Sequence, residues 1–253
     1  MNKVHVGTMG WSYSFWKGSF YPEGLAQDQF LTEYSKHFDT VEVDYTFYRV
    51  PSESTVTSWK SQTSLAKPFV FAAKFPRVIT HQKMLKDCDE EASWFIERIS
   101  KLRGNLGPLL LQFPAAFKPE HVERLRDFLP SLPKQHRYAV EIRNKKSLTN
   151  RLYSLLREND VALTIVDSPL IPAVEEMTAD FAYIRWEGDR KKVSGTLGKT
   201  ETDRTSDIEK WARIIKSLQE KTTEVFGYFS KYYSGYPPTD AKKLLEFLEL
   251  DRT

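Results

Sequence analysis

The sequence predicts an α/β fold, a single (β/α)8 TIM-type barrel domain spanning residues 1–253, with parallel strands and outer helices. Short strand-like runs alternate about eight times with longer segments of helical period. The chain length of 253 residues suits such a barrel, which typically takes ~250. A doubly wound open sheet is the alternative. Its phosphate-binding glycine turn is not matched here, because Gly7 and Gly10 stand at the wrong spacing.

The eight expected strands are short apolar runs bounded by polar or turn-forming residues. They lie at residues 4–7, 40–44, 69–74, 108–112, 138–142, 162–167, 181–186 and 225–229. Amphipathic helices are expected at 27–37, 54–64, 88–102, 120–129, 148–159, 207–221 and 239–248. Residues 188–204 are polar and basic without apolar periodicity, so we expect a long loop after the seventh strand.

The composition restricts the class of protein. No apolar run approaches the roughly 20 residues of a membrane span, and the N-terminus lacks a signal-peptide pattern, so we expect a cytoplasmic protein without membrane contact. The only cysteine, Cys88, excludes an intrachain disulfide and a multi-cysteine zinc site. A net charge of +3 fits an anionic ligand and is far from a nucleic-acid-binding signature.

Ionisable side chains gather at the C-terminal ends of the expected strands. Alternation along each strand places one parity inside the barrel, and barrel active sites lie at this end. For the sixth strand the same argument places Leu163 and Ile165 inside, below Asp167. The inward-facing rim then consists of Glu42, Asp44, Lys74, Gln112, Glu141, Arg143, Asp167, Arg185, Glu187 and Tyr228. So many buried charges must form a salt-bridge network, face water or hold a ligand, and their one-sided placement favours a ligand pocket.

The rim suggests distinct chemical roles. We expect the acid–base groups to be Glu42, Glu141 and Asp167, with His81 after the third strand as a further catalytic candidate or a helix cap. The cations Lys74, Arg143 and Arg185 suit a phosphate or carboxylate. The rim side chains Asp44, Gln112 and Glu187 complete the expected ligand contacts, and Tyr48 and Tyr228 offer hydroxyl or stacking contacts. No metal site is predicted outright. Mg²⁺ or Mn²⁺ on the rim carboxylates is an alternative, opposed by the three cations and the absence of a histidine pair.

The loop at residues 11–22 is dense in aromatic side chains. We expect Phe15, Phe20 and Tyr21 to form a lid packed on the barrel, and Trp11 to face the site as a stacking surface. The basic run at residues 190–192 is expected to be solvated surface.

Several segments together are similar to the YecE-like family, the domain of unknown function numbered seventy-two. They are Gly7-Thr8-Met9-Gly10-Trp11-Ser12-Tyr13 with Phe20-Tyr21-Pro22, Phe38 to Asp44 running into Thr46-Phe47-Tyr48-Arg49, Phe71 to Lys74 with Ile79-Thr80-His81, Gly107 to Pro114, and Glu141-Ile142-Arg143. The chain departs from the family pattern at Asp44, at Glu187 and at the pair Ser230-Lys231. The resemblance implies a TIM-type barrel and supplies no reaction.

The leading functional prediction is an enzyme that acts on an anionic ligand by carboxylate acid–base chemistry. The ligand would be a phosphorylated sugar, a nucleotide or a nucleic-acid fragment. One alternative is a non-catalytic module that binds single-stranded nucleic acid or a partner protein. Another is a divalent-metal-dependent hydrolase or isomerase.

Overall fold

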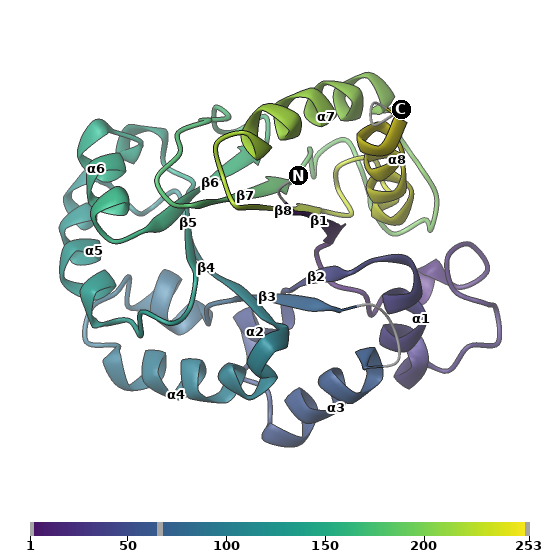
Figure 1. Cartoon of the computed structure of the whole chain (residues 1–253), viewed down its shortest axis with the longest axis horizontal. Coiled ribbons are helices and arrows are strands. Elements are labelled where there is room, and N and C mark those ends of the chain that lie inside the picture. Colours follow the sequence, from purple (N-terminus) through teal and green to yellow (C-terminus); the bar gives the residue numbers. More distant parts are fainter. Residues whose placement is uncertain (1–2, 65–67, 251–253) are drawn as a thin grey trace.

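A computed structural model describes residues 3–64 and 68–250, and its strands form one parallel sheet curved into a nearly closed barrel with helices around it (Figure 1). Each strand falls on its predicted segment, and this confirms the TIM-type barrel. In this described part of the chain the strands are β1 (Lys3–Thr8), β2 (Thr40–Val43), β3 (Val70–Lys74), β4 (Leu106–Phe113), β5 (Tyr138–Ile142), β6 (Val161–Asp167), β7 (Phe181–Trp186) and β8 (Glu224–Phe229). Their order around the sheet is β1-β8-β7-β6-β5-β4-β3-β2.

The barrel closes between β1 and β2 by a short contact at the strand ends. Met9 pairs with Glu42 in an isolated parallel bridge, and the amide of Gly10 donates to the carbonyl oxygen of Glu42 at 2.8 Å. Lower down, Gly7 lies directly against Thr40, where a Cβ would come within 2.3 Å of the carbonyl oxygen. A side chain at this position would force the seam apart, so the close approach requires glycine.

The helices surround the sheet, as Figure 1 shows. They are α1 (Phe30–His37), α2 (Tyr45–Tyr48), α3 (Glu53–Thr63), α4 (Asp89–Ile99), α5 (Val122–Phe128), α6 (Asn150–Glu158), α7 (Thr205–Gln219) and α8 (Pro237–Leu250). The predicted helices are confirmed with ends shifted by a few residues, while the one-turn α2 was not predicted and ends β2 one residue early. Residues 188–204 contain neither helix nor strand, as expected. No helix among the described residues is long and apolar enough to cross a membrane.

The barrel interior is filled unevenly. Strands β3, β5 and β6 contribute only alanines to its centre, whereas β7 and β8 contribute large aromatic rings. The buried interior set is Met9, Ala72, Leu110, Ala139, Ala162, Phe181, Tyr183, Phe226 and Tyr228. Large rings and small side chains thus share the interior, in keeping with the packed layers of this fold.

One strand has the opposite phase to the prediction. In β6, Ala162 faces the interior, while Leu163 and Ile165 belong to the core between the sheet and the helices. The predicted inward phase for Leu163 and Ile165 is therefore wrong. Asp167, which shares their parity, points outward toward α7.

Candidate functional site

A cavity of about 540 Å³ opens at the C-terminal ends of the strands, and we call it the mouth cavity. Its walls come from the ends of strands far apart in the sequence and from the loops that follow them. The lining residues are Met9, Tyr13, Asp44, Phe47, Tyr48, Lys74, Arg77, His81, Gln112, Arg143, Arg185, Glu187, Arg190, Ser230, Lys231 and Tyr232. The structure therefore brings together Asp44, Tyr48, Lys74, His81, Gln112, Arg143, Arg185 and Glu187 of the predicted site.

Arg185, at the end of β7, is the centre of a buried ion-pair network. Only 2% of its side chain is exposed. Its Nε and Nη2 hold both oxygens of Glu42, at 3.0 Å to Oε2 and 2.9 Å to Oε1. Its Nη1 donates to Glu141 Oε2 at 2.5 Å and to Glu187 Oε1 at 2.6 Å. Nη2 also contacts the sulfur of Met9 at 3.2 Å and lies 3.9 Å from Asp44 Oδ1. One guanidinium thus fixes three carboxylates.

A second cation and a tyrosine complete what we call the Arg185 network. The Nε of Arg143 donates to Glu141 Oε1 at 2.7 Å, and its Nη2 donates to Glu187 Oε1 at 2.6 Å. The hydroxyl of Tyr183 donates to the Oε2 atom of Glu42 at 2.7 Å. Arg143 remains partly exposed to the cavity. Its Nη1 has no hydrogen-bond or ion-pair partner among the described residues, so this nitrogen is available to a ligand.

The carboxylates of the network differ in proton affinity. Burial raises the pKa of Glu42 to about 7, and the nearby Asp44 adds to this against the opposing effect of Arg185. Burial acts in the same sense on Glu141, but Arg185 and Arg143 overcome it and hold its pKa at about 2. The same two guanidiniums lower the pKa of Glu187 against its burial. Glu42 is therefore the carboxylate of the three that takes up a proton most readily as the pH approaches neutrality from above.

Lys74, the last residue of β3, differs from Arg185 in having no anionic partner among the residues that the structure describes. Its side chain is only 7% exposed, yet its ammonium makes no hydrogen bond or salt bridge within the described residues and lies 4.1 Å from the ring centre of Phe47. Burial lowers the pKa of Lys74, with Asp44 acting in the opposite direction. A buried ammonium without a partner is costly, which is why such groups are uncommon outside binding and catalytic sites.

Three further cations stand around the cavity, and the sequence interpretation did not place them in the site. Arg77 is exposed, and no hydrogen bond or ion pair involves it in the described structure. Arg190 contacts Glu187 Oε2 at 3.3 Å, and Lys231 lies 5.1 Å from the ring of Tyr232. Each follows the C-terminal end of a strand by a few residues, and this position in the sequence is the feature that could have indicated a place in the site. The lining as a whole holds six cations and two carboxylates.

Two lining residues could exchange protons with a ligand. His81 lies in a short π-helical turn, Val78–Gln82, where its Nδ1 shares a hydrogen bond of 2.9 Å with the hydroxyl of Thr80. Burial, together with the charge of Lys74, lowers the pKa of His81 to about 4, so the ring is neutral at pH 7. Asp44 is partly exposed, and its closest cation is Arg185 at 3.9 Å. A neutral imidazole and a free carboxylate are both proton acceptors.

The structure places five of the predicted residues outside the lining of the mouth cavity. Glu42 and Glu141 are completely buried within the Arg185 network. Asp167 accepts a hydrogen bond of 2.8 Å from the indole of Trp211 on α7, on the outer side of the sheet. Its predicted inward position is wrong because the phase of β6 was misassigned. The two others are Tyr228, which is buried with its hydroxyl 2.8 Å from that of Thr40, and Trp11, which lines a neighbouring cleft.

The aromatic loop packs mainly against α1. Tyr21 is buried, and its ring stacks on Phe30 of α1 with centres 4.2 Å apart. Phe20 packs edge-on against Tyr21 at 4.9 Å. Trp11 keeps part of its ring exposed beside the mouth. The predicted lid of Phe15, Phe20 and Tyr21 is not seen over the mouth cavity, because Phe20 and Tyr21 pack on α1 and none of the three lines the cavity.

No group of three or more His, Cys, Asp or Glu side chains in the described parts of the chain is placed to hold a metal ion. Of the rim carboxylates that suggested Mg²⁺ or Mn²⁺, three accept hydrogen bonds from Arg185 or Arg143, namely Glu42, Glu141 and Glu187. The fourth, Asp167, accepts one from Trp211 on the outer side of the sheet. The metal-dependent alternative stays a prediction, and the described residues offer no set of side chains that would bind the metal.

Comparison with known proteins gives one consistent result. The model of a family described as "Protein of unknown function DUF72" matches residues 5–253. The UPF0759 protein YecE of Escherichia coli K12 is 36% identical over 141 residues, which are 56% of this chain and 48% of YecE, so the match spans about half the length of that relative. The UPF0759 protein YunF of Bacillus subtilis is 25% identical over 277 residues, covering 98% of this chain and 95% of YunF.

Solved structures agree. A DUF72 family protein from Thermotoga maritima superposes with a TM-score of 0.83 at 28% identity, covering 99% of this chain and 100% of that one. A DUF72 family protein from Enterococcus faecalis has a TM-score of 0.78 at 20% identity, with 98% of both chains covered, and supports the fold alone.

Proposed function

This chain belongs to the family described as "Protein of unknown function DUF72", and we propose that its mouth cavity binds a small anionic molecule and acts on it as an enzyme. The ligand class is a phosphorylated or carboxylated metabolite. The observation that carries the proposal is Lys74, a nearly buried ammonium without an anionic partner in the described structure. A ligand oxygen would supply the missing partner.

The rest of the cavity supports the same ligand class. Its lining carries a surplus of cations, and they surround the position of Lys74 from several strand ends. Arg143 has one nitrogen free for a ligand oxygen, and Arg77 has its whole guanidinium free among the described residues. Arginine pairs well with the planar arrangement of oxygens in phosphate and carboxylate.

The acid–base roles change from those expected on the sequence. Glu42 and Glu141 would act as positioning residues, because they hold Arg185 and Arg143 and do not line the cavity. Of the lining residues that can accept a proton, Glu187 is held by hydrogen bonds from Arg185 and Arg143, so we assign the acid–base step to Asp44 or His81.

The binding test uses inorganic phosphate and pyrophosphate with the purified protein. Isothermal titration at low ionic strength should detect binding to the wild type that weakens as salt is added, because the contacts are ionic. Lys74→Met should weaken it strongly and Lys74→Arg much less. The matched control is Lys3→Met, which removes the same charge at the opposite, N-terminal end of β1.

Two results would count against the proposal. One is that neither anion binds, and the other is that Lys3→Met weakens binding as much as Lys74→Met. To separate an enzyme from a non-catalytic binding protein, Asp44→Asn and His81→Gln would be compared with wild type in a screen of phosphorylated and carboxylated compounds. Loss of turnover with retained anion binding supports the enzyme.

A further inference from the structure

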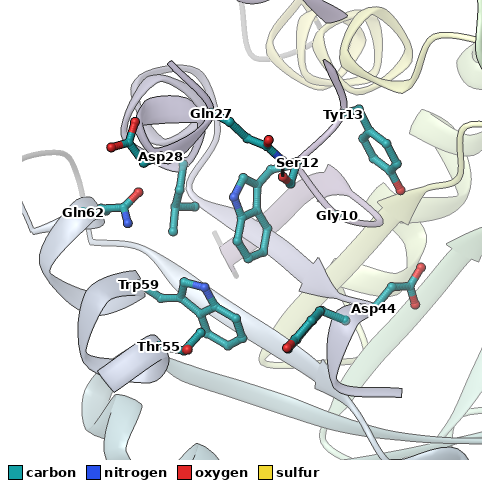
Figure 2. Close-up of a pocket in the computed structure, with 12 residues that line it drawn as sticks. Gly10, Ser12, Tyr13, Gln27, Asp28, Asp44, Thr55, Trp59 and Gln62 are labelled. Carbon is teal, nitrogen blue, oxygen red and sulfur yellow. Dashed lines mark hydrogen bonds between the residues drawn. The ribbon is translucent and has the colours of Figure 1, made fainter. Parts of the chain in front are cut away.

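A second cavity, which we call the aromatic cleft, lies beside the mouth cavity and shares part of its wall. The cleft has a volume of about 390 Å³. Tyr13 and Asp44 line both cavities. Figure 2 shows the cleft extending from Gln62 and Asp28 at one end to Tyr13 and Asp44 at the other. A ligand anchored in the mouth cavity could therefore extend past Asp44 into the cleft.

The walls of the aromatic cleft are flat and firmly held rings. Trp11 and Trp59 meet at 90° with ring centres 5.7 Å apart. Trp59, on α3, stacks on Phe71 of the core at 6.2 Å, and this contact fixes its orientation. Tyr45 stands edge-on to Trp59 at 6.4 Å and is 49% exposed. Exposed aromatic surface of this kind in a concave site is suited to binding another ring.

The two cavities differ sharply in charge. The mouth cavity is lined by six cations, whereas the only charged residues in the described part of the chain that line the aromatic cleft are Asp28 and Asp44. The uncharged polar side chains of the cleft include the amides of Gln27 and Gln62 and the hydroxyls of Ser12 and Thr55. The cleft therefore suits a neutral ring whose edge carries N–H or O–H donors. The anionic part of the same ligand would remain in the mouth.

Asp44 stands at the junction between the two cavities. Its carboxylate is about one-third exposed, and Arg185, at 3.9 Å, is the only ion-pair partner it has in the described structure. A partly free carboxylate can accept hydrogen bonds from two neighbouring hydroxyls. Acidic side chains bind ribose hydroxyls in this way in nucleotide-binding folds.

From these features we propose that the anionic ligand of this barrel is a nucleotide. The base would lie in the aromatic cleft against Trp11, the ribose hydroxyls would bind Asp44, and the phosphate would bind Lys74. This proposal rests on the proposed function, because it takes the mouth cavity as the phosphate end of the site. It adds the identity of the part of the ligand that lies outside the mouth cavity.

The cleft favours a base over a second sugar. A sugar phosphate has no aromatic plane, so it would occupy the mouth and gain little from two perpendicular indoles. A base offers a flat face to one indole and an edge to the other, and its ring nitrogens and amino groups can reach acceptors such as Asp28. Stacking of a base on an aromatic side chain changes affinity by about 5- to 150-fold.

The first test compares ligands on the unmodified protein, so it needs no variant that must fold. Isothermal titration is carried out with AMP, GMP, CMP and UMP, with ribose 5-phosphate, with adenosine and with inorganic phosphate. At least one nucleotide should bind about tenfold or more tightly than ribose 5-phosphate, which has the same phosphate and ribose without the base. The 2′-deoxy form of that nucleotide should bind more weakly, because it lacks one hydroxyl for Asp44.

The second test locates the base. Trp11→Ala should reduce nucleotide affinity to that of ribose 5-phosphate and leave ribose 5-phosphate binding unchanged. Lys74→Met should weaken both ligands. The matched control is Trp94→Ala, which removes an indole that is 52% exposed on α4, outside both cavities.

The outcomes separate the two proposals. If ribose 5-phosphate binds as tightly as every nucleotide, or if Trp11→Ala weakens both equally, the nucleotide assignment is overturned while the anion-binding function stands. If none of the phosphorylated compounds and no inorganic phosphate binds, the proposed function fails as well. A third outcome would overturn the assignment of the phosphate to the mouth. In it, adenosine binds without a phosphate and Lys74→Met has no effect on nucleotide affinity.

Discussion

Replacing Lys74 by methionine should make the protein more stable and less able to bind anions. In most buried sites the loss of a charged side chain removes a favourable pair. Here the ammonium is 7% exposed and, within residues 3–64 and 68–250, has neither a salt bridge nor a hydrogen bond. Its burial lowers its pKa, which means that the folded protein holds this proton less favourably than the unfolded chain does. Methionine has a similar length and no charge to bury.

The expected magnitudes have opposite signs. Removal of an unfavourable buried charge of this kind belongs with substitutions that add about 0.5–2 kcal/mol to the free energy of unfolding. For a domain of this length, each 1 kcal/mol moves the melting temperature by about 2–4 °C. A hydrogen bond between an ammonium and a phosphate contributes about 1.5–3 kcal/mol, so the dissociation constant for phosphate should rise about 10- to 150-fold.

The pH dependence gives an independent check on the same residue. Because the pKa of Lys74 lies below its usual value in the folded protein, the ammonium loses its proton at a lower pH than an exposed lysine would. Phosphate affinity of the wild type should therefore fall as the pH rises through this lowered pKa. The same loss should be absent in Lys74→Arg, since the guanidinium stays charged over this range.

The assays are differential scanning calorimetry for stability and isothermal titration for binding, carried out on wild type, Lys74→Met and Lys74→Arg. Lys3→Met again serves as the matched control. A Lys74→Met protein that melts several degrees lower and binds phosphate as tightly as wild type would refute the reasoning. In that case Lys74 would be a structural cation with a partner elsewhere.

Three further predictions concern charges of other kinds. Arg185→Met should lower the free energy of unfolding by about 3–5 kcal/mol in urea denaturation, since it leaves three buried carboxylates without their shared guanidinium. A loss of stability no larger than that of the exposed control Arg190→Met would contradict the role of Arg185 as the centre of the network. Burial raises the pKa of Asp240 on α8 to about 7, so the free energy of unfolding should fall as the pH rises from about 4 to about 7. The variant Asp240→Asn should flatten this dependence on pH. A slope that is the same in the variant and in wild type would mean that Asp240 is ionised throughout. With a pKa of about 4, His81 is neutral at physiological pH. Phosphate affinity should therefore show no change that reflects protonation of a histidine between about pH 5.5 and 8, in wild type or in His81→Gln. A change in affinity near pH 6.5 that disappears in the variant would show that His81 becomes charged.

The barrel and most of its inward residues could be predicted from the sequence because polar and apolar residues alternate clearly in most strands. In β2, Glu42 stands between Val41 and Val43, and only one phase leaves the valines against the helices. Strand β6 offers no such contrast. Its sequence, Val-Ala-Leu-Thr-Ile-Val-Asp, is mainly apolar on both faces, so alternation could not decide which face is inside.

The barrel interior decides the phase of β6. The rings of Tyr183 and Phe226 already occupy much of the interior, and the small side chain of Ala162 shares it with them, whereas Leu163 belongs to the core between the sheet and the helices. That constraint comes from β7 and β8, which lie in later parts of the chain. The position of Asp167 follows from it, since Asp167 shares the outward phase of Leu163.

The pairing of the rim charges was also beyond the sequence. Alternation placed Lys74 and Arg185 at the same end of the barrel as equivalent cations. In the structure, Arg185 contacts three carboxylates and Lys74 contacts none of those described. Arg77 and Lys231 were missed for a related reason, because they lie beyond the strand ends, where alternation no longer determines direction.

The contrast between the two cations bears directly on how a ligand would bind. A ligand that needed Arg185 would have to displace a buried carboxylate, which would cost several kcal/mol. Lys74 and the free nitrogen of Arg143 can meet a ligand oxygen without breaking any contact of the Arg185 network. Binding should therefore add to the stability of the protein, by about 2.7 kcal/mol when the ligand is present at 100 times its dissociation constant. A phosphate-dependent rise in the melting temperature that Lys74→Met abolishes, while the Arg185 network remains intact, is the expected consequence of this division between a paired and an unpaired cation.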